Sequence, residues 1–135
     1  MNALNNVNIE NVTELASPER IKEQVPLSDS AAEVVSAGRR AISDIMSGKD
    51  NRLMIILGPC SIHNYELAMD YAHKLKELKE QFPNFLLVMR VYFEKPRTTT
   101  GWKGLINDPH LDGSYEISEG LLMARKILLE IAELG

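Results

Sequence analysis

Two short, uninterrupted apolar runs constrain the fold of this chain more than any other feature. The first is Leu53–Leu57, and the second is Leu86–Met89, within a strand expected to run from about Phe85 to Phe93. Neither run alternates with polar residues, which indicates strands buried on both faces, as in a parallel sheet. Between them lies a helical pattern that Asn64 can cap and that Pro83 must break. We therefore predict a right-handed β-α-β unit.

Further helices are predicted on both sides of this unit. Ser17 precedes a short helix, and Ser30 with Glu33 forms a capping box for a longer one. Ser118 is expected to cap a last helix that continues to the end of the sequence. Residues 1 to about 16 show no firm periodicity, so they are expected to form an arm that needs a partner surface to become ordered.

Composition and charge narrow the class of protein. The 135 residues, 44% hydrophobic and 25% charged, are typical of about one folded domain. The formal net charge of −4 argues against binding to nucleic acid or to a membrane surface, which both require a basic face. No apolar run approaches the roughly 20 residues of a membrane span, and the polar N-terminus does not resemble a signal peptide. We expect a cytoplasmic protein.

A basic loop follows the second predicted strand. Arg90 lies inside that strand, and Lys95 and Arg97 follow it, together with the threonines at 98–100. Burying a guanidinium is costly unless an anion or a water-filled pocket accompanies it, and phosphate or carboxylate fits this set of groups. The charge pattern alone fits a solvated surface loop after an edge strand equally well.

Cys60 and His63 come directly after the first predicted strand. A single cysteine cannot form an internal disulfide, so Cys60 is a reduced core thiol, a metal ligand or a nucleophile. The carboxyl ends of strands are where β/α barrels assemble their active sites, which favours a functional role. A mononuclear metal site usually needs three or four ligands, however, and spacing alone favours a buried structural cysteine.

Two motifs carry a resemblance to a known family. GPCSIH at 58–63 and KPRTTTGWKGLINDPH at 95–110 resemble the N-terminal part of the metal-dependent, feedback-regulated microbial 3-deoxy-D-arabino-heptulosonate 7-phosphate (DAHP) synthases. The resemblance runs from about residue 12 to the last residue. It implies an α/β fold with an N-terminal arm and helical extension (1–50), followed by the first two βα units (51–135) of a truncated (β/α)8 TIM barrel.

The same resemblance implies a reaction and a set of site residues. The family condenses phosphoenolpyruvate with D-erythrose 4-phosphate to DAHP and phosphate, in the first step of the shikimate pathway, and requires a divalent metal cation. By this resemblance Cys60 is a metal ligand, and Arg90 and Lys95 contact phosphoenolpyruvate. Lys95 is also the catalytic group near the reacting carbon, and His63 is a candidate for supporting the metal site without binding the metal. By the same resemblance, the erythrose 4-phosphate site includes Pro96, Arg97 and Thr98.

Two hypotheses of different class follow from this resemblance. The first is the N-terminal portion of a DAHP synthase that is inactive alone, because the other metal ligands and several phosphate contacts would come from later strands. The second is a non-catalytic regulatory or assembly fragment of the same family. An unrelated metal- or phosphate-binding module is a third option, against which two long motifs weigh. The full-length enzyme would be a homo-oligomer, with an aromatic amino acid as its inhibitor and no nucleic acid or membrane partner.

Overall fold

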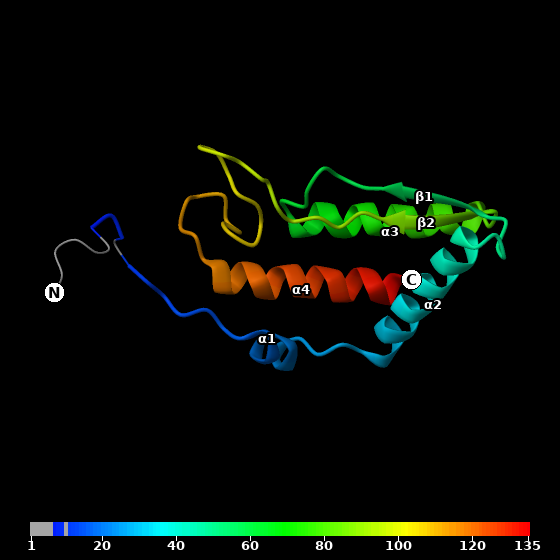
Figure 1. Cartoon of the computed structure of the whole chain (residues 1–135), viewed down its shortest axis with the longest axis horizontal. Coiled ribbons are helices and arrows are strands. Elements are labelled where there is room, and N and C mark those ends of the chain that lie inside the picture. Colours follow the sequence, from blue (N-terminus) through cyan, green and yellow to red (C-terminus); the bar gives the residue numbers. More distant parts are fainter. Residues whose placement is uncertain (1–6, 10) are drawn as a thin grey trace.

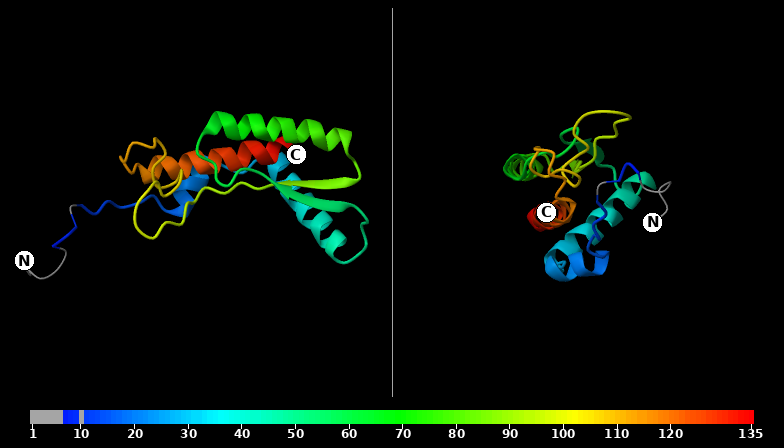
Figure 2. Two further views of the ribbon diagram at one scale, coloured as in Figure 1. Left: turned by 90° about the horizontal axis from the view of Figure 1, so that it is seen from above. Right: turned by 90° about the vertical axis from the view of Figure 1, so that its left-hand side faces the viewer.

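A computed structural model of the chain describes residues 7–9 and 11–135 (Figure 1). Residues 14–17, before the first helix, lie beside Ser118 and Leu122 of the last helix, and the described residues that precede them extend outward (Figures 1 and 2). None of the helices in the described part combines the length and apolar character needed to cross a membrane. The elements follow the order α1 (Pro18–Gln24), α2 (Asp29–Met46), β1 (Leu53–Leu57), α3 (Tyr65–Gln81), β2 (Phe85–Met89) and α4 (Ile117–Leu134).

The two strands form the parallel sheet that the sequence predicts. Leu53 of β1 lies opposite Phe85 of β2, and the register continues to Leu57 opposite Met89. The strands are joined by α3, so the α/β class and the β-α-β unit are confirmed. Both strands point toward the same end of the molecule, where the loops that follow them lie together (Figure 1).

Local sequence signals explain where α3 begins and ends. The side chain of Asn64 accepts a hydrogen bond from the backbone N–H of Leu67 at 2.8 Å, as expected of a helix cap. The helix ends at Gln81, before Pro83. The buried face of the helix is made of small and apolar side chains, namely Ala68, Ala72 and Leu75.

The start of α2 corrects one prediction. The cap is Ser28, whose hydroxyl accepts from the N–H of Ala31 at 3.3 Å, and Ser30 lies inside the helix. The expected capping box of Ser30 with Glu33 is therefore wrong. The Ser28 hydroxyl also donates to Glu133 of α4 at 2.6 Å, so the cap links two helices that lie far apart in sequence. A local pattern could not reveal this contact.

The start of α4 corrects a second prediction. Glu116 occupies the cap position without a side-chain hydrogen bond, and Ser118 lies within the first turn. The preceding loop sets this boundary, because Tyr115 has a φ of 55° and its carbonyl accepts from the N–H of Ile117 at 2.7 Å. The backbone of the loop thus takes the place of the predicted serine cap.

Both strands differ from the prediction in extent or burial. Strand β2 ends at Met89, so the expected continuation to Phe93 is wrong. In β1, Leu53 and Ile56 are each 62% exposed, which contradicts the expected burial on both faces. The described residues contribute two strands, and α3 packs against both β2 and α4.

The hydrophobic core lies at the end of the molecule where the strands finish. Helix α4 packs against α1, α2 and α3, and it contributes Ala124 and Ile127 to the core. Phe93 and Leu105 come from the long segment between β2 and α4, and burial of each such side chain contributes about 1.5–3 kcal/mol. The core cluster of buried residues is Ile62, Ala68, Phe93, Leu105, Ala124 and Ile127.

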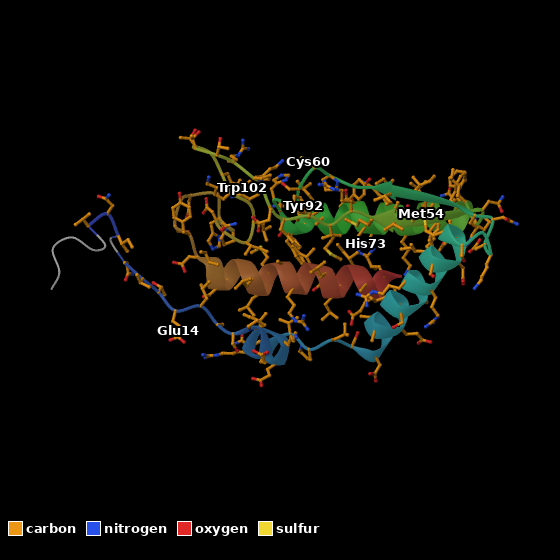
Figure 3. The ribbon with its side chains drawn as sticks, in the orientation of Figure 1. Glu14, Met54, Cys60, His73, Tyr92 and Trp102 are labelled. Atoms are coloured by element: carbon orange, nitrogen blue, oxygen red, sulfur yellow. The ribbon has the colours of Figure 1, made fainter. Side chains whose placement is uncertain are left out.

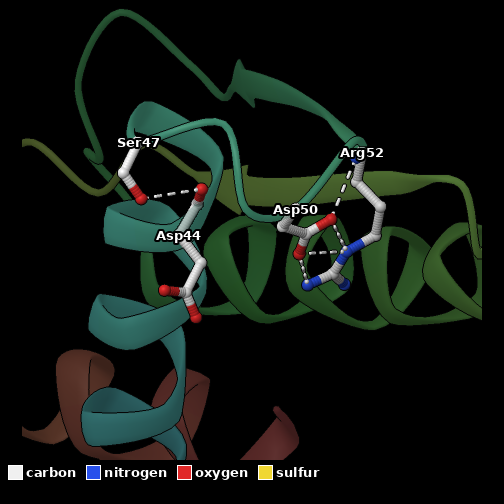
Figure 4. Close-up of polar contacts among 4 residues, drawn as sticks. All are labelled: Asp44, Ser47, Asp50 and Arg52. Atoms are coloured by element: carbon white, nitrogen blue, oxygen red, sulfur yellow. Dashed lines mark hydrogen bonds and ion pairs between the residues drawn. The ribbon is translucent and has the colours of Figure 1, made fainter.

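The opposite end of the sheet is entered through a polar turn (Figure 4). The Ser47 hydroxyl donates to the carbonyl oxygen of Asp44 at 3.2 Å, just after α2 ends. The guanidinium of Arg52 donates to both carboxylate oxygens of Asp50, and this hydrogen bonding holds the pKa of Asp50 below its ordinary value. These contacts fix the chain direction into β1.

A matched pair of glycine substitutions tests the packing of α4. A methyl group at Gly120 would collide with the backbone of Ile106, whereas one at Gly38 in α2 would meet nothing within 4 Å. We expect Gly120→Ala to lower the free energy of unfolding by about 1–3 kcal/mol and Gly38→Ala to raise it by about 0.5–1 kcal/mol. Urea denaturation measures both. A Gly120→Ala variant as stable as the wild type would contradict the packing.

Candidate functional site

Two segments of sequence meet beyond the carboxyl ends of the paired strands. The N–H of Arg90 donates to the carbonyl of Leu57 at 2.7 Å, extending the pairing of β2 with β1. The N–H of Ile62 donates to the carbonyl of Tyr92 at 2.7 Å. Gly58 makes this approach possible, because a side chain there would collide with the Arg90 carbonyl. The 58–63 motif is thereby fixed against the segment that leads into the basic loop.

Arg90 does not have the environment that the sequence predicted. It lies one residue beyond β2 and is exposed, so its placement inside a buried strand is wrong. Its Nη1 group donates to the carbonyl oxygens of Pro59 and Cys60, at 2.9 and 2.5 Å. The guanidinium therefore joins the two segments and remains accessible to solvent.

Cys60 is an exposed thiol, which contradicts the buried structural cysteine that spacing alone favoured. Ser61 and Ile62 are buried instead, and they anchor the turn that carries Cys60. Lys95 Nζ donates to Cys60 Sγ at 3.1 Å. This hydrogen bond, with the charge of Lys95 and a smaller effect of Arg90, lowers the pKa of Cys60 below its ordinary value. The thiolate, which is the form that binds metals, is favoured accordingly.

The basic loop is held at its base by the core. Phe93 and Leu105 are both buried, and the N–H of Leu105 donates to the Phe93 carbonyl at 3.1 Å. Inside this pair, the N–H of Lys95 donates to the carbonyl of Lys103 at 2.9 Å. Residues 96–101 are therefore exposed on a closed loop with buried ends.

Polar contacts within the loop orient the remaining cations. Arg97 Nε donates to the carbonyl of Trp102 at 3.0 Å, and Lys103 Nζ donates to the carbonyl of Arg97 at 3.0 Å. The Trp102 ring packs against the core, and its N–H donates to the Asp108 carbonyl at 2.8 Å. Its predicted role as a packing anchor is confirmed.

The predicted site residues fall into one connected group and several separate positions. Cys60, Lys95 and Arg90 are joined by hydrogen bonds, and Cys60 lies at the same end of the molecule as Tyr92 and Trp102 (Figure 3). No side-chain hydrogen bond within the described residues connects Arg97 or Thr98 to that group. Three predicted residues are exposed without side-chain hydrogen bonds in the same part of the chain, namely His63, Pro96 and Thr98.

A metal site is incomplete among the side chains described. Within residues 7–9 and 11–135, no three histidine, cysteine or acidic side chains are grouped so as to hold an ion. Cys60 alone has the accessibility and the thiolate character of a ligand. Sequence reasoning missed the Pro59 and Cys60 carbonyls that hold Arg90, for which no sequence signal exists.

The other two histidines lie outside this group. His73 is exposed on α3, as expected. His110 Nε2 lies 3.1 Å from the Glu119 carboxylate at the start of α4, and this hydrogen bond raises the pKa of His110 above its ordinary value. The pair connects the loop to the helix and has no contact with Cys60.

Comparisons with known proteins agree on one family. Residues 17–133 match the model of the DAHP synthetase I family. The chain is 52% identical over 98% of its length to the Tyr-sensitive phospho-2-dehydro-3-deoxyheptonate aldolase of Escherichia coli K12, and 50% identical over 94% to the Phe-sensitive enzyme of that strain. The solved structure of phospho-2-dehydro-3-deoxyheptonate aldolase from Francisella tularensis SCHU S4 superposes with a TM-score of 0.88 at 46% identity, over 93% of this chain.

These matches cover only part of each relative. The chain spans 38% of the Tyr-sensitive protein, 37% of the Phe-sensitive protein and 37% of the Francisella chain. Both the 58–63 motif and the basic loop lie within the residues that match the family model.

The contact between Lys95 and Cys60 predicts a change in thiol reactivity. Removing the ammonium in Lys95→Met is expected to raise the pKa of Cys60, so that alkylation by iodoacetamide at pH 7.5 slows and its pH profile moves to higher pH. Lys103→Met is the matched control, because Lys103 bonds to a loop carbonyl and not to sulfur. Equal rates in wild type and Lys95→Met would contradict the contact. Cys60 is the only cysteine, so the measurement reports one site.

The His110–Glu119 pair predicts a pH dependence of folding stability. Because the folded-state pKa of His110 is raised, the pair stabilises the fold below the unfolded-state pKa, and this contribution is lost as pH rises through the folded-state pKa. Glu119→Gln should lower the midpoint of the His110 titration measured by NMR. A midpoint unchanged by Glu119→Gln would exclude the ion pair in solution.

Proposed function

Because the chain belongs to the DAHP synthetase I family, we propose that it forms part of the active site of a DAHP synthase. The reaction condenses phosphoenolpyruvate with D-erythrose 4-phosphate to give DAHP and phosphate. The observation that carries this proposal is the 3.1 Å contact between Lys95 Nζ and Cys60 Sγ, beside a guanidinium bonded to the same turn. A thiolate, an ammonium and a guanidinium are thus gathered beyond the strand ends of a β-α-β unit, in keeping with two βα units of a (β/α)8 barrel.

Cys60 is proposed as one ligand of a divalent metal cation. Its exposure and the lowered pKa of its thiol fit that role. A bound divalent ion would polarise the aldehyde oxygen of erythrose 4-phosphate. In this proposal the other ligands belong to the part of a family-length protein that this chain does not span, and His63 supports the site without binding the ion.

Arg90 and Lys95 are proposed to act on phosphoenolpyruvate. The guanidinium of Arg90 suits a bidentate contact with phosphate or carboxylate. C3 of phosphoenolpyruvate attacks the aldehyde carbon, and the Lys95 ammonium stabilises the developing alkoxide or gives it a proton. Water adds at C2, and phosphate then leaves. Lys95 reaches this region because its loop is closed by the backbone contact to Lys103.

Pro96, Arg97 and Thr98 are proposed to form the site for erythrose 4-phosphate. All three are exposed on the loop that carries Lys95. The bond from Arg97 Nε to the Trp102 carbonyl anchors the side chain and leaves its terminal nitrogens to bind phosphate. The exposed hydroxyl of Thr98 would add a hydrogen bond to the same anion.

Regulation and assembly follow from the same proposal. The relatives named Tyr-sensitive and Phe-sensitive support an aromatic amino acid as inhibitor. A homo-oligomer is supported by the exposed apolar side chains before α1, with Val7, Ile9 and Val12 between 53% and 81% exposed. The proposed location is the cytoplasm.

Activity measurements test the proposal in two proteins. With both substrates and a divalent metal, the product of the complete gene should form DAHP, and Lys95→Met should lower kcat by about 10²–10⁴-fold. Lys74→Met, on the exposed face of α3 and paired with Asp70, should leave activity unchanged. The 135-residue chain alone should form no DAHP, since it spans 38% of its relative. An inactive gene product, or a fully active Lys95→Met variant, would refute the assignment.

A further inference from the structure

Tyr92 has a contact for which the proposed reaction gives no account. Its ring centroid lies 4.9 Å from Cζ of Arg90, which is placed over the ring face as in a cation–π contact. The side chain is 40% exposed and lies at the same end of the molecule as Cys60 (Figure 3). Its hydroxyl has no hydrogen-bond partner among the residues that the structure describes. The aromatic ring of Tyr92, and not its hydroxyl, therefore makes the contact with Arg90.

The hydrogen bonds of Arg90 show which edge of its guanidinium is free. Nη1 has two N–H groups, and these donate to the carbonyls of Pro59 and Cys60. In the described part of the chain these are the hydrogen bonds of the guanidinium, and a weaker polar interaction of the Arg90 side chain with the Cys60 thiol leaves Nε and Nη2 available. Because these two nitrogens lie on the same side of the planar group, they form the fork that binds carboxylate or phosphate with two parallel hydrogen bonds.

We propose that Tyr92 is a positioning residue, whose ring fixes the plane of the Arg90 guanidinium so that the Nε–Nη2 fork is presented to an anionic substrate. The carbonyls hold one edge of the group and the ring holds one face, which leaves one orientation for the free edge. The chemical class of the ligand is a phosphorylated carboxylate. Its identification as phosphoenolpyruvate rests on the proposed function.

The structural role of Tyr92 is separable from this one. Its backbone carbonyl accepts from the N–H of Ile62, and this bond does not depend on the side chain. The neighbouring residue Phe93, which is 8% exposed, is part of the hydrophobic core, whereas the Tyr92 ring is not. Replacing the ring should therefore change the orientation of Arg90 and leave the loop folded.

NMR of the 135-residue chain tests this inference. The Nε–Hε signal of Arg90, assigned by its loss in Arg90→Lys, is followed while phosphoenolpyruvate is added. In the wild type this signal should show a ring-current shift and should move with the ligand. Tyr92→Phe keeps the ring and should retain both properties. Tyr92→Leu should lose the ring-current shift and bind about twofold to fivefold more weakly, as expected for loss of an exposed cation–π contact.

Each outcome decides between defined alternatives. The Ile62 amide signal reports the fold of the loop in every variant, and Tyr92→Met is a second variant without a ring, should Tyr92→Leu not fold. Equal affinity of Tyr92→Leu and wild type would overturn the role of Tyr92 and leave the proposed function intact. Tyr92→Phe as weak as Tyr92→Leu would assign the effect to the hydroxyl and also overturn it. If the Nε–Hε signal of Arg90 in the wild type did not move on addition of phosphoenolpyruvate, the anion site itself would be refuted, and with it the proposed role of Arg90.

Discussion

The parallel pairing of β1 with β2 is the constraint on which the site depends. Parallel strands finish at the same edge of a sheet, so the residues that follow Leu57 and Met89 meet although they are far apart in sequence. The bonds from Arg90 to Leu57, Pro59 and Cys60 continue that pairing past the strand ends. The exposed Cys60 thiol is thereby placed within hydrogen-bonding distance of a lysine from a separate motif.

Packing then gives the basic loop a fixed base. Phe93 and Leu105 enter the same core as Ile62, which follows the Cys60 turn, so one hydrophobic cluster anchors both segments. Helix α4 completes that cluster with Ala124 and Ile127 and also contacts α1 and α2. Through α4, the N-terminal helices α1 and α2 are linked to the cluster that anchors both motifs.

The sequence predicted those features that depend on local patterning. The β-α-β unit, the Asn64 cap and the α/β class follow from apolar runs, a capping residue and a helix breaker, and the structure confirms them. The two long motifs likewise predicted the family, which the comparisons confirm. Features that depend on distant contacts were missed. Ser28 caps α2 while bonding to α4, and Cys60 is exposed because its neighbours turn inward.

In the site, too, local patterns were predicted and distant contacts were missed. Residue types predicted an anion-binding loop and a thiol near a strand end, but not that Arg90 lies outside the strand with Nη1 bonded to backbone carbonyls. Periodicity cannot reveal this arrangement, because carbonyl groups occur at every residue. The roles of Cys60, Lys95, Arg97 and Thr98 toward metal and substrates remain proposals.

The pairing of the Cys60 thiolate with the Lys95 ammonium is the central claim, and an NMR pH titration of the wild-type chain tests it most directly. The Cβ signal of Cys60 and the Cε signal of Lys95 are followed together. We expect Cys60 to titrate below its ordinary pKa and the Lys95 signal to move in the same pH step, since the two groups lie 3.1 Å apart. A Cys60 titration at or above the ordinary pKa, with no response at Lys95, would contradict it.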